Sequence, residues 1–485
     1  MKLTKEFIFI ILLIGVSLFL RTYNLSSVMQ FIPDQGWFYL SARDMLLTGH
    51  IPLVGPPTSH PWIHHGPLWT YMLGILLFMF NFDPVMPAYF IAVLGTITVV
   101  LFYFVVKIMF GFRLAIFSTI LYAASPLIVL NSRIPYHTSP IPFFVILLFF
   151  FVFLWTKGKM WTFPVITFIL GVLYNHEITT FVYFICVVLV FLYGIVNKKQ
   201  WSKKLLHVKV ASISLLTFLI PMIPFVLHDV QNGYGQTVKF LIWVGYRIVK
   251  APLALIHPSF VSSGSNPSTF GEFFVYYTQL IFAFNSHIAL LVLISSCIYL
   301  LSKTKKYIHV SRCSNVFKIG VHFEAIKSEY ALLVLFVLVG FVGLLTHRVP
   351  IEADTLLIAP FIIIITAITI FWILNSKFKL ALCLIILIAA ANAYYLFHTN
   401  YLTQNTKHNR ITYEARMQAV GKVIHIANGN SYTIVGRGEL SDFPVFLMPY
   451  EYLLWWMKSP VEKTNSEKTI EIWEQGDTIK VIEIK

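Results

Sequence analysis

Long apolar runs recur from residue 7 to residue 398 and set the pattern of the chain. A helix needs roughly 20 residues to cross the hydrocarbon core of a bilayer, and a spanning backbone must satisfy its own hydrogen bonds there. The runs therefore predict an all-α polytopic membrane protein with about 11 transmembrane helices. The expected spans are 7–22, 87–106, 114–131, 140–156, 161–174, 178–196, 208–228, 279–301, 330–346, 354–375 and 379–398.

Two segments near the N-terminus have the pattern of helices that lie in the membrane interface. The apolar stretch 67–82 is short and is bounded by Asp83-Pro84, so it either spans the membrane or lies along its surface. Residues 35–47 have apolar side chains at helical spacing, which suits an amphipathic interfacial helix. Both segments belong to a long loop, residues 23–86.

The chain changes character after residue 398. Within residues 399–485, Tyr413 to Asn428 has helical spacing, Ser431 to Val435 has the composition of a strand, and Thr478 to Lys485 alternates apolar and polar residues. The pattern predicts two domains. Residues 1–398 form the membrane domain, and residues 399–485 form a small α/β domain packed on one of its faces.

Composition supports a membrane protein and argues against a soluble domain and against a fold held by disulfides or zinc. Hydrophobic residues make up 58% of the chain and charged residues 12%, whereas an ordinary soluble domain has roughly 25% charged residues. The mean hydropathy is +0.76. The four cysteines form no CxxC pair, which argues against a disulfide framework or a zinc cluster.

Charge predicts the orientation, because Lys and Arg accumulate in cytoplasmic loops. With the N-terminus inside and 67–82 not crossing, 19 basic residues lie inside and 7 lie outside before residue 399. If 67–82 crosses, this asymmetry collapses. We therefore expect eleven spans in the plasma membrane, a cytoplasmic N-terminus and an extracytoplasmic C-terminal domain. The net charge of +15 is explained by this asymmetry, and no nucleic-acid partner is implied.

The first outer loop is dense in polar residues and prolines, and Asp34 stands just before its predicted helix. A carboxylate at that position can cap the helix, because the free N–H groups and the helix dipole stabilise it. It can equally be a reactive group on the outer face. Position alone leaves both interpretations open.

Four segments of this loop carry a resemblance to a known family: Asp34-Gln35, Ala42-Arg43-Asp44, Leu53 to Ser59 and His64-His65-Gly66-Pro67-Leu68. With them the chain resembles the protein O-mannosyltransferase-like branch of the multi-helix (C-type) glycosyltransferases, which includes the aminoarabinose transferases. In that family an acidic residue opens an interfacial helix in the first outer loop and is the catalytic base. The resemblance implies this role for Asp34, and substrate binding for Arg43, Asp44, His64 and His65.

Three later patches extend the resemblance, at residues 131–137, 171–177 and 223–233. They add candidate substrate-binding residues: Arg133, His137, His176, Glu177 and Asp229. The first patch lacks the second acidic residue that many relatives carry there. Structural interpretations stay open for these residues, including a snorkelling Arg133 and a helix end at His176-Glu177.

The large outer loop 229–278 contains basic residues near a helical period, including Lys239 and Arg247. They predict one basic face on a helix otherwise rich in apolar side chains. This face can bind substrate or anchor the helix to lipid headgroups, and the sequence does not separate the two.

The resemblance implies an inverting glycosyltransferase on the outer face of the membrane. Its donor would be a polyprenyl-phosphate-linked hexose or pentose, and its acceptor a hydroxyl of a protein, a glycan or a lipid. The residue pattern indicates no cofactor and no metal ligands, although a divalent metal is compatible with the family. The alternative is a transporter or flippase of lipid-linked sugars, which forms no bond. Such proteins place ionisable residues within their spans and often have repeated halves, and neither feature stands out here.

Overall fold

The computed structural model describes residues 2–58, 62–256, 269–305, 308–313, 316–321, 328–347, 352–399, 402, 411–462, 466–476 and 478–484. Helices dominate the membrane domain. As far as residue 176 they are α1 (Lys2–Thr22), α2 (Leu25–Val28), α3 (Pro33–Thr48), α4 (Leu68–Met79), α5 (Met86–Phe110), α6 (Phe112–Ala124), α7 (Pro126–Asn131), α8 (Ile141–Thr156) and α9 (Thr162–His176).

The second half of the membrane domain continues the helical pattern. It contains η1 (Ile178–Phe181), α10 (Val182–Val196), α11 (Gln200–Lys203), η2 (Lys204–Leu206), α12 (Val208–Gln231), α13 (Gly235–Ile256), α14 (Thr269–Ile281), α15 (Ser286–Lys305), α16 (Ser328–His347), α17 (Glu352–Ile373) and α18 (Phe378–His398). Between α15 and α16 lies an antiparallel hairpin of β1 (Ile308–Cys313) and β2 (Val316–Val321), which the apolar pattern did not predict.

Every expected span contains helix, but two of them are broken. The span expected at 114–131 is divided at Ser125, which is extended, because Pro126 has no N–H to continue the helix and instead begins α7. The span expected at 279–301 is divided by a 94° bend between α14 and α15.

A side chain of α18 stabilises the bend between α14 and α15. Asn392 accepts a hydrogen bond from the backbone N–H of Ala283 and donates to the carbonyl of Ile281. Asn285 then accepts from the N–H groups of His287 and Ile288 at the start of α15. Four backbone groups that the break would leave unpaired in a membrane are thereby satisfied.

Length and composition identify fewer complete spans than the eleven expected. Among the described residues, five helices are long and apolar enough to cross a membrane, or six if the bent pair of α14 and α15 is one span. They are Met86–Phe110, Ile178–Val196, Val208–Gln231, Thr355–Ile373 and Phe378–His398. Five other apolar helices are shorter, α4 among them with 12 residues, and α1 has 21 residues but also carries charged side chains at both ends. The count of eleven therefore stays a prediction.

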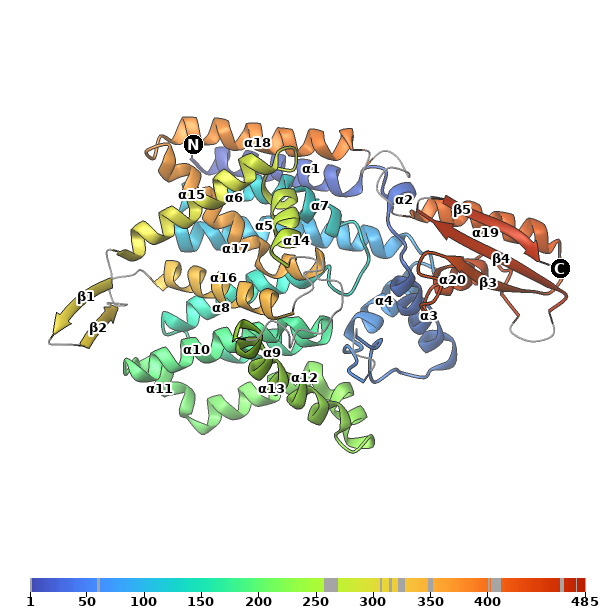
Figure 1. Ribbon diagram of the computed structural model, residues 1–485, viewed down its shortest axis with the longest axis horizontal. Helices are drawn as coiled ribbons and strands as arrows, with labels where there is room; N and C mark the ends of the chain where they lie inside the picture. Colours follow the sequence, from blue (N-terminus) through green and yellow to red (C-terminus); the bar gives the residue numbers. More distant parts are fainter. Residues whose placement is uncertain are drawn as a thin grey trace.

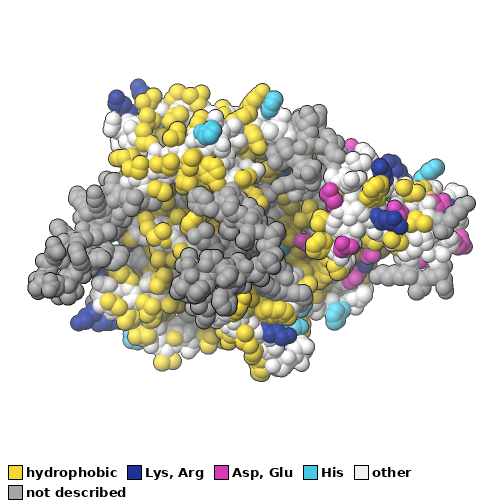
Figure 2. All heavy atoms as spheres, viewed as in Figure 1, with side chains coloured by type: hydrophobic (Ala, Val, Ile, Leu, Met, Phe, Trp, Pro, Cys, Tyr) yellow, Lys and Arg dark blue, Asp and Glu magenta, His cyan; other side chains and the backbone are white. Residues whose placement is uncertain are grey.

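The surface of the helical body is apolar in the way that lipid contact requires. On α5, the exposed side chains Val93, Ile97, Phe104 and Ile108 form one stripe. Figure 2 shows hydrophobic side chains covering the described surface between the two ends, with acidic side chains gathered over the C-terminal domain. A soluble monomer rarely exposes so much contiguous apolar surface.

The C-terminal domain is the expected small α/β unit. Its helix α19 (Tyr413–Ala427) and strands β3 (Tyr432–Gly438) and β5 (Thr478–Ile484) confirm the three elements predicted from the sequence. Helix α20 (Met448–Trp456) and strand β4 (Lys468–Gln475) were not predicted. The sheet order is β3-β4-β5, with β4 parallel to β3 and antiparallel to β5.

A buried ion pair ties this domain together. Arg416 of α19 lies 2.8 Å from the Glu474 carboxylate of β4, and the hydroxyl of Tyr450 in α20 donates to the same carboxylate. The pair is enclosed by apolar residues, including Val420, Leu453 and Ile472. The Glu474 carboxylate thus joins α19 and α20 to the sheet inside an apolar core.

The C-terminal domain packs directly on the first outer loop. A Cβ at Gly36 of α3 would lie 2.3 Å from the backbone nitrogen of Pro449 in α20, so only glycine permits this approach. The Tyr452 hydroxyl donates to the carbonyl of Phe82, and the N–H of Tyr413 donates to the carbonyl of Met29. Figure 1 shows α2, α3 and α4 beside this domain, at the end of the helical body opposite the β1–β2 hairpin.

Candidate functional site

Asp34 lies in the first turn of α3 and is exposed. It is not the capping residue, because the helix begins at Pro33 and the side-chain oxygen of Gln35 accepts the backbone N–H of Ile32. The Gln35 amide also donates to the carbonyl of Pro135, which joins α3 to the second outer loop. Asp34 is thus near the positive end of the helix dipole without being used to cap the helix.

Among the residues that the structure describes, Tyr136 is the side-chain partner of Asp34. Its hydroxyl donates to Asp34 Oδ2 over 3.1 Å. Burial, and then the charge of Asp34, raise the pKa of Tyr136 well above its ordinary value. The phenol therefore stays protonated and remains a hydrogen-bond donor to the carboxylate throughout the physiological range.

Three candidate residues from separate loops converge next to Tyr136. His137 Nε2 lies 3.3 Å from Glu177 Oε2, and His65 Nδ1 lies 3.9 Å from the same oxygen. The His65 and His137 rings are 4.7 Å apart between centroids. One potential ligand atom from each of the three residues lies within 4.8 Å of the others, so this cluster could hold a metal ion.

Opposing effects set the charges in this cluster. Burial by itself would raise the pKa of Glu177, but His65 and His137 and the N–H of Thr179 outweigh it and lower that pKa to about 2. Burial lowers the pKa of His65 to about 4, although the Glu177 charge acts in the other direction. The cluster at neutral pH therefore contains an ionised carboxylate beside a neutral His65 imidazole.

A tight backbone contact holds His65 in this place. A Cβ at Gly66 would lie 2.0 Å from the Asn175 side-chain oxygen, and the Gly66 N–H donates to the Asn175 carbonyl. On its other side, His65 forms backbone hydrogen bonds with Gly55 and Pro56. The chain at His65 and Gly66 is therefore held against the C-terminal end of α9, which Glu177 directly follows.

Two of the predicted substrate-binding residues have structural partners instead. Arg133 is buried and donates to the carbonyls of Leu20, Arg21 and Tyr23, so it caps the C-terminal end of α1. His176 is fully buried, and its ring stacks on Phe144 with 5.9 Å between centroids. Both side chains are buried, and their part in substrate binding stays a prediction.

Asp229 is also occupied. Its carboxylate accepts the N–H groups of Gln236 and Thr237 and so connects α12 to the start of α13. Gln236 in turn donates to the carbonyl of His64. Asp229 thereby places α13 against the first outer loop.

His64 and Lys239 form a basic region next to this connection. The His64 ring lies 6.2 Å from the His228 ring. Burial, and then the neighbouring His228 and Lys239, lower the pKa of His64. Lys239 is exposed on α13, and the side chain of Arg247 lies outside the described part of the structure.

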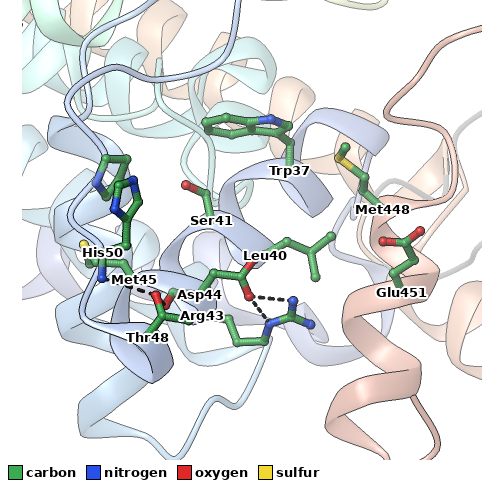
Figure 3. Close-up of a pocket in the computed structure, with 11 residues that line it drawn as sticks. Trp37, Leu40, Ser41, Arg43, Asp44, Met45, Thr48, His50, Met448 and Glu451 are labelled. Atoms are coloured by element: carbon green, nitrogen blue, oxygen red, sulfur yellow. Dashed lines mark hydrogen bonds and ion pairs between the residues drawn. The ribbon is translucent and has the colours of Figure 1, made fainter. Parts of the chain in front are cut away.

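Arg43 and Asp44 line a pocket of about 390 Å³ between α3 and α20. Arg43 Nε donates to Asp44 Oδ1 over 2.7 Å, and its guanidinium lies 5.0 Å from the centroid of the Trp455 ring. Figure 3 shows the pocket with Trp37, Ser41 and His50 from the first outer loop and Glu451 from α20.

Known proteins are similar to this chain in part of the sequence and in the fold. The model of the dolichyl-phosphate-mannose-protein mannosyltransferase family matches residues 60–227. Comparison with curated protein sequences gives no match. The structure of ArnT from Cupriavidus metallidurans bound to undecaprenyl phosphate is similar, with a TM-score of 0.54 and 11% identity over 94% of this chain and 76% of that chain.

A second solved structure is similar over nearly the same region. It is the archaeal oligosaccharyltransferase AglB from Archaeoglobus fulgidus, in complex with an inhibitory peptide and a dolichol-phosphate. The TM-score is 0.56 and the identity 12%, over 93% of this chain and 64% of the AglB chain. This chain has the fold of the C-type glycosyltransferases. The resemblance seen in the sequence is confirmed, and the protein is an integral membrane protein.

Within this C-type fold, sequence reasoning missed three features of the site. It did not single out Tyr136, it named Gln35 only as part of the segment Asp34-Gln35, and it predicted no metal-binding group. The residues of the cluster are separated by more than a whole helix in the sequence, so no spacing motif could have revealed them. In the sequence, the one hint of the role of Tyr136 was its position directly before the candidate residue His137.

Proposed function

We propose that this protein is an inverting glycosyltransferase that moves a sugar from a polyprenyl-phosphate-linked donor to an acceptor hydroxyl on the outer face of the membrane. The observation that carries the proposal is Asp34. It is exposed in the first turn of α3, is not used as a cap and is hydrogen-bonded to Tyr136, in a chain with the C-type fold.

The chemistry needs one base and a stabilised leaving group. Asp34 takes the proton of the acceptor hydroxyl as its oxygen attacks the anomeric carbon. The bond between that carbon and the phosphate oxygen breaks, and the polyprenyl phosphate leaves with the electron pair. Direct attack from the opposite face inverts the configuration. Tyr136 orients the carboxylate during this step.

The phosphate of the donor fits the basic region formed by His64, His228 and Lys239. His228 Nδ1 is buried without a hydrogen-bond partner, and Lys239 is exposed on the amphipathic helix α13. Lys239 supplies positive charge that stabilises the departing phosphate, and the neutral His64 imidazole can donate a hydrogen bond to it. ArnT and AglB, the two similar structures, contain undecaprenyl phosphate and a dolichol-phosphate respectively, which supports a donor of this class.

The acceptor fits the pocket between α3 and α20. Trp37, Ser41, Asp44 and Thr48 line it, and at 3.6 residues per turn they share one face of α3 with Asp34. The base therefore stands at the N-terminal end of the pocket. An aromatic ring among carboxylates and a hydroxyl suits a polyhydroxylated or peptide acceptor. In this proposal the C-terminal domain contributes to acceptor choice through Glu451 and takes no part in bond making.

The competing function is transport of the lipid-linked sugar without bond formation. A test uses purified protein in liposomes with a radiolabelled polyprenyl-phosphate hexose or pentose and a panel of glycan, peptide and lipid acceptors. We expect a labelled glycoside of inverted configuration and free polyprenyl phosphate. Movement of intact donor across the bilayer without a labelled glycoside would refute the proposal in favour of a flippase.

The matched variants are Asp34→Asn and Asp83→Asn. We expect Asp34→Asn to reduce turnover by about 10²-fold or more at unchanged donor binding, the scale expected for a lost general base. Asp83 accepts the N–H of Val85 at the start of α5, a role that Asn can also perform, so its variant should keep near-normal turnover. Equal turnover in the two variants would show that Asp34 is not the base.

A further inference from the structure

Arg21 is a fully buried cation at the C-terminal end of α1. Its guanidinium is charged at neutral pH, yet in the described part of the structure it donates only to neutral oxygens. One of its terminal nitrogens, Nη2, is buried without a hydrogen-bond partner. A buried charge is normally paired with an opposite charge, so an arginine kept here without one indicates a function beyond packing.

The contacts of Arg21 join α1 to the second outer loop. Arg21 Nε donates to Ser132 Oγ over 3.2 Å, and Nη1 donates to Ser17 Oγ of the same helix over 2.9 Å. Nη1 also donates to the carbonyl of Ala123, at the end of α6. On the other side of Ser132, a Cβ at Gly95 of α5 would lie only 2.6 Å from the Ser132 Cβ. Ser132 is therefore enclosed between Arg21 and α5.

Arg133 makes the same link in the opposite direction. Its guanidinium donates to the carbonyls of Leu20 and Arg21, at the end of α1. Arg21 thus reaches from α1 to the second outer loop, and Arg133 reaches from that loop back to α1. We call this reciprocal pair the arginine clamp. Neither arginine has a carboxylate partner among the residues that the structure describes, so neutral oxygens alone hold the clamp.

The clamp holds one end of the short segment that carries Tyr136. The other end is held by Gln35 of α3, whose amide donates to the carbonyl of Pro135 over 3.3 Å. The N–H of Tyr136 itself donates to the carbonyl two residues earlier, which tightens the segment between these two points. A shift of the loop at the clamp is therefore transmitted to the Tyr136 hydroxyl, which lies 3.1 Å from the carboxylate of Asp34.

We propose that Arg21 is a positioning residue for sugar transfer. The arginine clamp fixes the second outer loop on α1 and thereby keeps the hydroxyl of Tyr136 on the carboxylate of Asp34. This inference rests on the proposed function, because Arg21 acts on the reaction only through these two residues. A purely structural Arg21 would cap the end of α6 and stabilise the helices, without any dependence on Tyr136.

A double-mutant cycle separates the two roles. Arg21→Lys keeps the charge, but an ammonium group lacks the planar fork that reaches Ser132 and Ala123 together. We expect kcat to fall about 10-fold at a near-normal KM for the donor, because misplacing an orienting group costs rate rather than binding. In the Tyr136→Phe background the same change should cost less than about twofold, since the hydroxyl that it positions is absent. Losses that multiply in the double variant would overturn the proposal.

Hydrogen–deuterium exchange of residues 131–137 tests the clamp without an activity assay. The full-length protein in detergent should exchange these amides faster in Arg21→Lys and in Ser132→Ala than in the wild type. Ser132→Ala removes only the oxygen that accepts from Arg21 Nε, so it decides the question if Arg21→Lys does not fold. Arg113→Lys is the matched control, because Arg113 is exposed at the start of α6, and its exchange and kcat should equal those of the wild type. Wild-type exchange in Ser132→Ala and Arg21→Lys would overturn the proposal.

The two measurements also distinguish this inference from the proposed function. A wild type that transfers no sugar, with slow exchange that Arg21→Lys accelerates, would refute the proposed function and leave the clamp supported. An inactive Asp34→Asn variant together with an Arg21→Lys variant of normal exchange and normal kcat would refute the positioning role alone.

Discussion

At the residue scale, the chemistry of Asp34 depends on its neighbours. Gln35 satisfies the N–H of Ile32, so Asp34 is not needed there. Tyr136 reaches Asp34 from a loop about a hundred residues later and donates to its carboxylate. The sequence predicted the carboxylate and the start of its helix, but the residue that orients it became visible only once the second outer loop was placed against α3.

Tyr136→Phe tests this orientation. Loss of a hydrogen bond to a charged group, worth roughly 1.5–3 kcal/mol, should lower kcat about 10-fold or more while KM for the donor stays near the wild-type value. Steady-state transfer rates at varied donor concentration measure kcat and KM.

Tyr452→Phe is the control for this substitution. The Tyr452 hydroxyl donates to the carbonyl of Phe82, so the variant loses a tyrosine hydrogen bond that does not involve Asp34. It should leave kcat near the wild-type value. An equally unchanged kcat in Tyr136→Phe would show that the Tyr136 hydroxyl does not orient the base.

At the element scale, the site depends on the contact between the loop 53–66 and the end of α9. Gly66 has no side chain, and this absence lets its backbone reach Asn175. Asn175 in turn donates to carbonyls of α9 and of α12, at Gly171 and Pro221. The loop, α9 and α12 therefore form one unit that presents His65 to Glu177.

Gly66→Ala should disrupt this unit. Its Cβ would lie 2.0 Å from the Asn175 side-chain oxygen and 2.8 Å from the Asn175 Cα, so the loop must move away. We expect the free energy of unfolding to fall by about 1–3 kcal/mol, as for overpacking in a well-packed interior. Transfer activity should fall as well, because the displaced loop carries His65. Thermal unfolding in detergent and the transfer assay measure the two effects.

Gly235→Ala provides the comparison, because no atom lies within 4 Å of a Cβ built at that position. Gly235 is also in an outer-face connection, at the start of α13. Its variant should unfold at the wild-type temperature. If Gly66→Ala also unfolds at the wild-type temperature, the contact with Asn175 does not position the loop.

At the scale of the whole molecule, the polar elements separate to the two ends of an apolar helical body. The first outer loop and the C-terminal domain lie together at one end, and the β1–β2 hairpin and α11 lie at the other (Figure 1). This separation agrees with the charge pattern, since α11 and the β1–β2 hairpin, which lie at this end, belong to basic segments of the sequence. Which end faces the cytoplasm is a prediction from the basic residues alone.

Reporter fusions test that orientation. Fusions after Asn197 and Lys305 should report the cytoplasm, and a fusion at the C-terminus should report the outside, because Lys and Arg are retained inside. Paired alkaline phosphatase and fluorescent protein reporters give opposite signals at each position and serve as internal controls. A cytoplasmic C-terminus would place Asp34 on the wrong side for a donor presented outside and would overturn the predicted topology.

What the sequence determined by itself follows from local physics. Apolar runs of membrane length must become helices, because lipid offers the backbone no partners, and alternation or helical spacing after residue 398 indicated the elements of the small domain. Adjacent residues also indicated the helix that starts at Asp34, whereas the role of Asp34 as a base was implied by the family resemblance.

The tertiary structure alone decided the rest. It brought His65, His137 and Glu177 together from three loops, used Arg133 and Asp229 as caps, and bent α14 against α15 where Asn392 of α18 satisfies the break. Each of these outcomes depends on which distant backbone groups a side chain meets. Contacts between residues far apart in the chain arise from packing, and no local pattern encodes them.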